Sequence, residues 1–87
     1  MYYVYVLRSL KNGRFYTGQT QDLKARLELH NSGKMKYTRK FTPWELIYYE
    51  TFETRSEAMH REKIFKTGAG REWLNRKLSE QNPEKES

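Results

Sequence analysis

Residues 2–19 read YYVYVLRSLKNGRFYTGQ. The stretch from Tyr2 to Leu7 is dense in valine and tyrosine, which favour β-strands. Asn12-Gly13 is a strong hairpin signal, because both residues tolerate positive φ angles. The residues from Arg14 to Gln19 are therefore expected to return as a second, antiparallel strand.

The length of the turn decides how two tyrosines of this hairpin lie relative to each other. A strict two-residue turn at Asn12-Gly13 would pair Tyr5 with Thr20, leaving Tyr5 and Tyr16 on one face but about 13 Å apart. A four-residue loop, residues 10–13, keeps them on that face as diagonal neighbours at about 7–8 Å. The looser turn is expected if both tyrosines belong to one site.

The next segment outward predicts a helix and a further strand. Thr20 or Asp22 can cap a helix that runs to about Asn31, and Gly33 ends it. Pro43 cannot donate to a strand ladder and so precedes a third strand, from Trp44 to Thr51.

The last part of the chain predicts two more helices. Thr54-Arg55-Ser56-Glu57 matches a capping box, which starts a helix that reaches about Thr67. Gly68-Ala69-Gly70 is expected to break that helix, and Arg71 to Ser79 to form a short third one, packed through Trp73, Leu74 and Leu78. The resulting order, β-β-α-β-α-α, indicates an α+β domain over residues 1–79, with a small, mainly antiparallel sheet and about three flanking helices. Residues 80–87 read as a disordered polar tail.

The composition bounds the class of function. A chain of 87 residues suits one domain with a modest core. It carries 17 Lys and Arg against 11 acidic residues, a net charge of +6, which attracts polyanions. Nucleic acid is the first partner expected and an anionic membrane surface the second; an ordinary solvated basic surface is the alternative.

The lack of cysteine and of a long apolar segment excludes further classes of protein. The chain has no cysteine, which excludes disulfides and thiolate metal sites. The apolar run from Tyr2 to Leu7 is far too short for a signal peptide or a membrane span, so a cytoplasmic protein is expected.

A long basic loop separates the first predicted helix from the third strand. Long loops in compact domains are usually functional or disordered. This one, from Ser32 to Pro43, interleaves cations with aromatic rings that can stack on bases. It is predicted to bind nucleic acid, with a merely solvated charged loop as the alternative; its residues are Lys34, Lys36, Tyr37, Arg39, Lys40 and Phe41.

The first predicted helix places polar residues beside its apolar stripe. Leu23 and Leu27 define the inward side on a wheel of about 100° per residue. Arg26 and His30, spaced i and i+4, fall next to that stripe. Taken alone, His30 is most simply a hydrogen-bonded filler, Arg26 an ion-pair partner, and the tyrosines sheet aromatics.

The second predicted helix shows the same feature more sharply. Ala58, Met59 and Phe65 mark its apolar stripe, and Glu62 lies in the middle of it. A carboxylate there is costly unless it is paired or bound to a metal. The simpler alternative is a pair with Lys66, at i+4, that extends to water.

Taken together, these residues resemble the GIY-YIG nuclease superfamily, and in particular its small stand-alone subfamily, which is uncharacterised or repair-endonuclease-like. The resemblance spans residues 2–78. It rests on Tyr3-Val4-Tyr5, Tyr16-Thr17-Gly18, Arg26, His30 and Glu62, and secondarily on Asn31-Ser32-Gly33-Lys34, Tyr37-Thr38-Arg39, Glu57-Ala58 and Lys66. The departures are Tyr3 and Val4 in place of the glycine and isoleucine of the first triplet, Thr17 in place of the isoleucine of the second, Gln19 where some members carry lysine, and Lys63 where several carry asparagine.

The resemblance implies a three-stranded antiparallel sheet flanked by helices and the cleavage of a phosphodiester with one divalent metal, Mg²⁺ or Mn²⁺. Glu62 would be the metal ligand, and Arg26 would stabilise charge on the phosphate. Tyr16 or Tyr5 would position or deprotonate the attacking water, with a pKa lowered by Arg26, a lysine and the metal. His30 would assist.

The expected function is therefore a Mg²⁺-dependent endonuclease acting on DNA. A nucleic-acid-binding module without turnover is the second reading, since the basic loop alone explains affinity. An RNA nuclease or a partner-recruited processing factor is the third. With no appended recognition domain expected, specificity would come from this fold, from a homodimer or from a protein partner.

Overall fold

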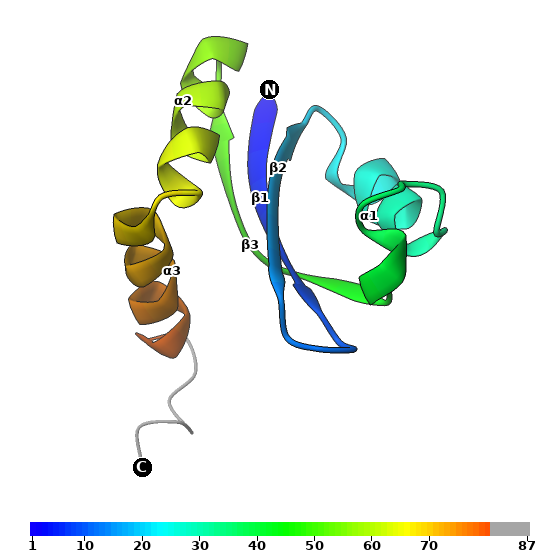
Figure 1. The fold of residues 1–87 in the computed structure, drawn as a ribbon. Coiled ribbons are helices and arrows are strands. Elements are labelled where there is room, and N and C mark those ends of the chain that lie inside the picture. The colour runs from blue at the N-terminus through cyan, green and yellow to red at the C-terminus, as the bar shows by residue number, and fades with distance from the viewer. Residues whose placement is uncertain (81–87) are drawn as a thin grey trace.

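The computed structural model describes residues 1–80 and folds them into three strands and three α-helices (Figure 1). The predicted order, β-β-α-β-α-α, is confirmed. Most of the predicted tail lies outside the described residues, although Glu80 ends a helix. The elements are β1 (Tyr2–Ser9), β2 (Phe15–Thr20), α1 (Leu23–Asn31), the short 3₁₀ helix η1 (Arg39–Phe41), β3 (Trp44–Phe52), α2 (Arg55–Phe65) and α3 (Gly68–Glu80).

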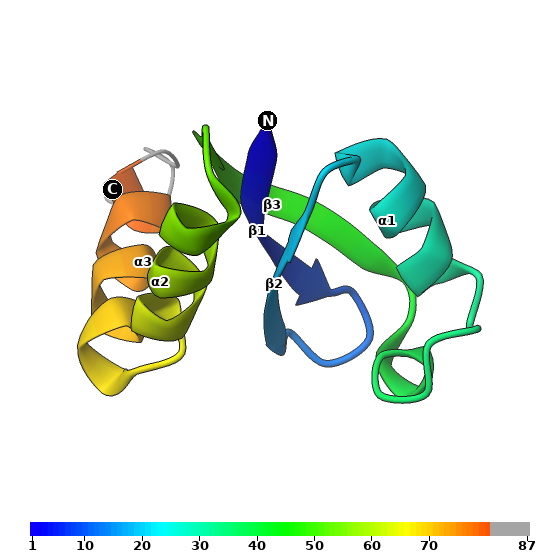
Figure 2. The same ribbon diagram turned by 90° about the horizontal axis from the view of Figure 1, so that it is seen from above.

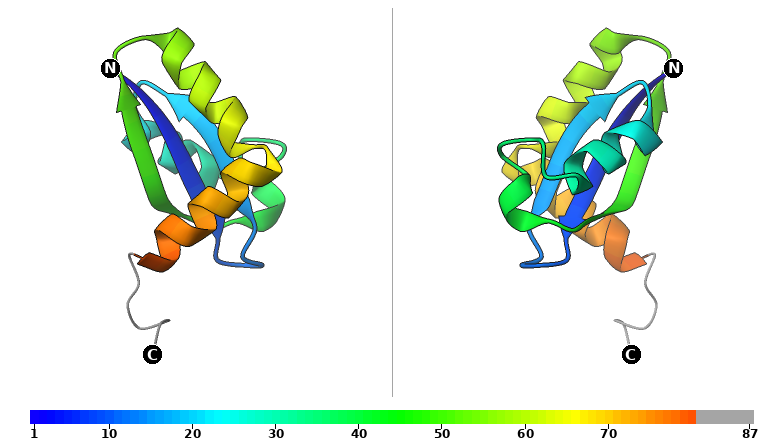
Figure 3. Two further views of the ribbon diagram at one scale, coloured as in Figure 1. Left: turned by 90° about the vertical axis from the view of Figure 1, so that its left-hand side faces the viewer. Right: turned by 90° about the vertical axis from the view of Figure 1, so that its right-hand side faces the viewer.

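The strands form one antiparallel sheet in the order β2-β1-β3. Seen from above, α2 and α3 cover one face of the sheet and α1 covers the other (Figure 2). Figure 3 shows these two faces in turn, and η1 lies on the α1 side. The fold is thus the predicted α+β architecture, with its sheet between two helical layers.

The central strand β1 has no face open to solvent. Val4 and Val6 point into a core formed with Ala58, Phe65 and Leu74 of the helices α2 and α3. The alternate residues of β1 point to the other side, where Tyr5 and Leu7 pack around Trp44. A strand covered on both faces favours a continuous apolar run over strict alternation, which explains the composition of residues 2–7.

The hairpin between β1 and β2 adopts the looser of the two turns. The backbone N–H of Ser9 donates to the carbonyl of Arg14 at 2.8 Å, which closes a four-residue loop in which Gly13 has a φ of 78°. This register pairs Tyr5 with Gly18. Tyr5 and Tyr16 consequently become diagonal neighbours, with ring centroids 6.4 Å apart. The predicted four-residue loop and the diagonal position of the two tyrosines are confirmed.

The helix starts follow local capping chemistry. Asp22, rather than Thr20, caps α1, with its carboxylate accepting from the N–H of Ala25 at 3.1 Å. The capping box of Thr54 and Glu57 at the start of α2 is present as predicted.

The prediction that the glycines after α2 act only as a break is wrong. They end α2, but Gly68 and Gly70 also form the first turn of α3, which begins three residues earlier than expected. A Cβ added at Gly70 would lie only 1.9 Å from the carbonyl oxygen of Ile64. The tight packing of this corner therefore overrides the low helix propensity of glycine.

None of the helices in the described part of the chain is long and apolar enough to cross a membrane.

Candidate functional site

The centre of the site is the hydroxyl of Tyr5, which strand β1 holds inside the molecule. Only 1% of Tyr5 is exposed. Its side chain crosses the backbone of the neighbouring strand at Gly18, where an added Cβ would lie 2.5 Å from the phenolic oxygen. Because Gly18 has no side chain, the Tyr5 ring can pass over β2 at this position.

His30 of α1 meets the Tyr5 hydroxyl and is fully buried. Its Nε2 lies 2.9 Å from the Tyr5 oxygen, and its Nδ1 lies 3.0 Å from Oγ1 of Thr38. Burial, together with the charge of nearby Arg26, lowers the pKa of His30 to about 4. The imidazole is thus neutral near pH 7, and it is not a surface base.

Thr38 is a site residue that sequence reasoning missed. It is completely buried, and its carbonyl accepts a hydrogen bond from Nε1 of Trp44 at 2.9 Å. Its hydroxyl faces His30, so Tyr5, His30 and Thr38 form one buried chain of hydrogen bonds. In the sequence, Thr38 stands out only as a member of the triplet Tyr37-Thr38-Arg39. That triplet does not indicate the contact between Thr38 and His30.

Arg26 of α1 lies near the Tyr5 hydroxyl, where its charge favours the ionised phenol. A guanidinium can only donate, so it cannot accept the Tyr5 proton. If the Tyr5 hydroxyl donates to Nε2 of His30, the neutral ring carries its proton on Nδ1 and can donate it to Thr38.

The charge of Arg26 alone does not lower the pKa of Tyr5 below its usual value. Burial, reinforced by the neighbouring Tyr16, raises the pKa of Tyr5 to about 12 and outweighs the opposing effect of Arg26. A phenol with such a raised pKa stays protonated near pH 7. The buried Tyr5 hydroxyl therefore lies behind the surface of the site.

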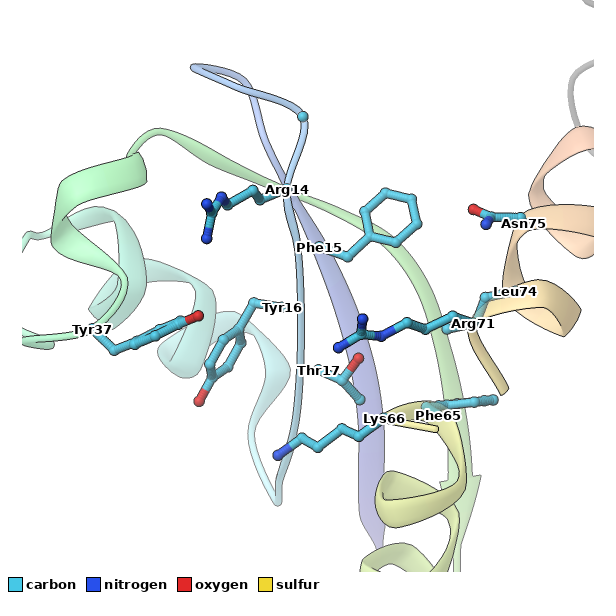
Figure 4. A pocket seen from close by; sticks show the side chains of 11 residues that line it. Arg14, Phe15, Tyr16, Thr17, Tyr37, Phe65, Lys66, Arg71, Leu74 and Asn75 are labelled. Atoms are coloured by element: carbon cyan, nitrogen blue, oxygen red, sulfur yellow. The ribbon is translucent and has the colours of Figure 1, made fainter. Parts of the chain in front are cut away.

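Tyr16 occupies the solvent side of this cluster. It is half-buried, and its ring packs against His30 at a centroid distance of 5.0 Å and against Tyr37 at 5.9 Å. Figure 4 shows its hydroxyl in a groove beside the ammonium of Lys66. Of the two candidate tyrosines, Tyr16 is the one a substrate can touch.

Glu62 reaches the site from α2, at the β2 edge of the sheet. Its Oε1 accepts from Nε2 of Gln19 at 3.1 Å, and its Oε2 accepts from Nζ of Lys66 at 2.8 Å. Its negative charge contributes to the raised pKa of Tyr5, so the two side chains interact electrostatically.

The predicted position of Glu62 in the middle of an apolar stripe is partly wrong. Met59 is 42% exposed, because α2 buries the side defined by Ala58 and Phe65 against the sheet and α3. Glu62 lies at the margin of that side, with 19% of its side chain exposed, and forms the pair with Lys66 that the sequence allowed as an alternative. The other four predicted site residues nevertheless converge on Tyr5 from three elements besides β1, namely β2, α1 and α2.

The basic loop is held in place by contacts with the buried Trp44. The side chain of Asn31 binds both the N–H and the carbonyl of Trp44, at 2.6 and 3.0 Å. Phe41 packs against Trp44, so it is not a free stacking platform as predicted. Tyr37, 65% exposed, keeps that ability. The predicted binding cations of the loop are accessible to solvent: Lys34, Lys36, Arg39 and Lys40.

A groove of about 770 Å³ runs along β2 past Tyr16 (Figure 4). Tyr37 lies on one side of it and α3 on the other. Its lining is basic and aromatic, and consists of Gly13, Arg14, Phe15, Tyr16, Thr17, Tyr37, Phe65, Lys66, Arg71, Leu74 and Asn75.

The donor set around Glu62 suits at most a weakly held cation. No group of three or more histidine, aspartate or glutamate side chains gathers for a metal anywhere in the described part of the chain. A single carboxylate whose charge is balanced by Lys66 leaves most ligand positions to water and to substrate oxygens. This arrangement fits a hard divalent ion such as Mg²⁺, which retains several waters and binds together with phosphate.

A comparison with known protein families identifies the family of the chain. The family model described as the GIY-YIG catalytic domain matches residues 1–76. The chain belongs to the GIY-YIG family. Membership indicates nuclease activity. The departures from the GIY-YIG motif at Tyr3, Val4 and Thr17 lie in strands, as expected.

Relatives of this GIY-YIG domain are small proteins of similar length. The chain is 45% identical to a UPF0213 protein of Bacillus pumilus, over 99% of this chain and 87% of that one. It is 49% identical to a UPF0213 protein of Streptococcus agalactiae, over 74% and 73% of the two chains. The solution NMR structure of a UPF0213 protein from Bacillus halodurans matches with a TM-score of 0.51 and 40% identity, covering 85% of this chain and 82% of that one.

Proposed function

We propose that this GIY-YIG domain is a metal-dependent endonuclease that hydrolyses phosphodiester bonds, with DNA as its substrate. The observation that carries the proposal is the convergence of a carboxylate, a guanidinium and two phenols on one centre, where one of the phenols, Tyr16, also lines a basic groove. Glu62, Arg26, Tyr5 and Tyr16 come from four different elements and surround one hydrogen-bonded centre. A structural role alone would not require so many unlike polar groups to meet.

Each group has a role that phosphodiester chemistry requires. Glu62 would hold Mg²⁺ or Mn²⁺, which when bound supplies neutralising charge on the phosphate and the leaving oxygen. Arg26 offers further positive charge to the transition state, in which negative charge accumulates on the phosphoryl oxygens. Tyr16, which lines the groove, would orient the attacking water by a hydrogen bond.

The buried residues hold these groups in place. The Tyr5 hydroxyl contacts the fully buried His30, and the His30 ring packs against Tyr16. Thr38 fixes the other side of His30. Rigid support of this kind lowers the cost of orienting the reacting groups. His30 thus assists through position, in its neutral form.

A nucleic-acid-binding module without turnover is the second candidate. The pairing of Glu62 with Lys66 and the raised pKa of Tyr5 favour it, since both describe a resting site that is not poised for catalysis. The contacts proposed for the groove bind phosphate groups, which DNA and RNA share. DNA is proposed over RNA on the resemblance to repair endonucleases.

One assay separates these candidates. Labelled DNA and RNA of the same sequence are incubated with the protein in Mg²⁺, in Mn²⁺ and in EDTA. We expect internal cleavage of DNA that requires the divalent ion and stops in EDTA. Binding without cleavage would support the second candidate, and preferential cleavage of RNA would replace DNA as the proposed substrate.

Neutralising the basic loop is expected to weaken the salt dependence of binding. The solvent-accessible cations Lys34, Lys36, Arg39 and Lys40 would release counterions from the bound strand. Changing all four to glutamine should therefore reduce the slope of log K against log salt by up to about 0.7–0.9 for each phosphate that is no longer neutralised. The measurement is binding of a labelled oligonucleotide in EDTA over a range of KCl concentrations. An unchanged slope would show that the loop is only a solvated surface.

A further inference from the structure

Helix α3 forms a wall of the groove that the proposed chemistry does not use. The lining continues from Tyr16 across β2 to Arg71, Leu74 and Asn75 of α3. Figure 4 shows the guanidinium of Arg71 extending from α3 over Thr17, on the same side of the groove as Lys66. The sequence predicted only a packing role for this helix.

The charge of the groove is only partly compensated, through the pair of Lys66 with Glu62. Arg14, Lys66 and Arg71 line it, and no carboxylate does. Within the described residues, the ion pairs are Arg8–Glu45, Arg61–Glu50 and Lys66–Glu62, so Arg71 takes part in none. An exposed guanidinium facing a concave basic surface is a binding group for an anion, because its planar fork matches two phosphate oxygens.

The packing of α3 against α2 determines where Arg71 lies. Gly70, the preceding residue, lies so close to Ile64 that no side chain fits there. Leu74, one turn later, is buried in the core beside Phe65. These two contacts hold the first turns of α3 against the end of α2, and they leave Arg71 and Asn75 on the groove side.

We propose that Arg71 and Asn75 bind the sugar–phosphate backbone of the substrate strand, so that the strand crosses β2 from Tyr37 and Tyr16 to helix α3. This inference rests on the proposed function in one respect only, that the ligand is a nucleic acid. Arg71 supplies charge and a bidentate hydrogen bond to phosphate, and the Asn75 amide supplies a neutral donor beside it. Such contacts determine where the strand lies and do not read its sequence.

The test is an equilibrium binding experiment in EDTA, where cleavage does not occur. The probe is a fluorescein-labelled DNA strand of mixed sequence, alone and annealed to its complement, with an RNA of the same sequence beside it. Fluorescence anisotropy is recorded at KCl concentrations from about 50 to 200 mM. The variants are Arg71→Gln, Asn75→Asp and the matched control Arg76→Gln. Arg76 is an exposed cation of the same helix that does not line the groove.

Arg71→Gln should weaken binding of the probe and lower the slope of log K against log salt by about 0.7–0.9, the value for one phosphate contact. Asn75→Asp should weaken binding as well, because it places a negative charge in the groove. Arg76→Gln should leave both quantities close to those of the unmodified protein, although it removes the same charge. Circular dichroism confirms that each variant is folded.

Equal effects of Arg71→Gln and Arg76→Gln would overturn the inference, since the loss would then reflect net charge alone. Unchanged binding by Arg71→Gln would overturn it too. If the protein binds the probe through Arg71 but cleaves neither DNA nor RNA in Mg²⁺, the inference stands and the endonuclease proposal fails. If cleavage occurs and Arg71→Gln binds normally, the endonuclease proposal stands and this inference fails.

Discussion

Glu62→Gln is expected to lower the rate of metal-dependent cleavage by about 10³-fold or more. The substitution keeps the size of the side chain and an oxygen that can accept from Gln19. It removes the negative charge, so a hard cation would lose the carboxylate ligand that the proposal assigns to it. Rates are measured under single-turnover conditions in Mg²⁺.

The same variant should remain stable. Lys66, the partner of Glu62, has 55% of its side chain exposed, and pairs of this kind contribute about 0–1 kcal/mol. Thermal melts without metal should therefore show a change in unfolding free energy of no more than about 1 kcal/mol. Glu72→Gln, at an exposed position of α3, makes the same change in charge and serves as the control. Full activity of Glu62→Gln, or an unfolded variant, would contradict the assignment.

Arg26→Ala is expected to lower the single-turnover rate by about 10²-fold with little change in substrate affinity. Arg26 stands beside the Tyr5 hydroxyl at the centre of the site and not among the residues that line the groove. We expect a charge at this place to stabilise the transition state more than the ground state. The comparison requires cleavage rates in Mg²⁺ and binding constants in EDTA for both proteins.

Lys24→Ala provides the matched control for Arg26, because Lys24 is an exposed cation of the same helix. We expect it to cleave at nearly the normal rate. Since the charge of Arg26 helps to lower the pKa of His30, the Arg26 variant should also raise that pKa, which NMR titration can detect. A variant that binds weakly but cleaves bound substrate normally would reassign Arg26 to affinity.

The parts of the structure that depend on near neighbours were predictable from the sequence. The hairpin follows from Asn12-Gly13, and the start of α2 follows from Thr54 and Glu57. Both features depend on backbone preferences and on hydrogen bonds between residues a few positions apart. The register of Tyr5 against Gly18 also followed, once both tyrosines were assigned to one site.

What could not be predicted depends on residues that are distant in the sequence. The burial of Thr38 arises because its loop folds against Trp44 and His30. The raised pKa of Tyr5 reflects the depth of β1, which no local pattern reveals. The groove wall at Arg71 exists only because α3 packs tightly on α2. Each of these is a property of the assembled domain.

The burial of β1 on both faces has a consequence for how such a domain can diversify. Every side chain from Val4 to Leu7 fills one of two cores, so an exchange there disturbs packing before it alters recognition. We therefore expect substitutions that change the substrate preference to lie at the periphery, in the loop around Tyr37 and on the outer turns of α3. The fold separates a centre that tolerates few exchanges from a margin that tolerates many, and Tyr5 lies in the centre.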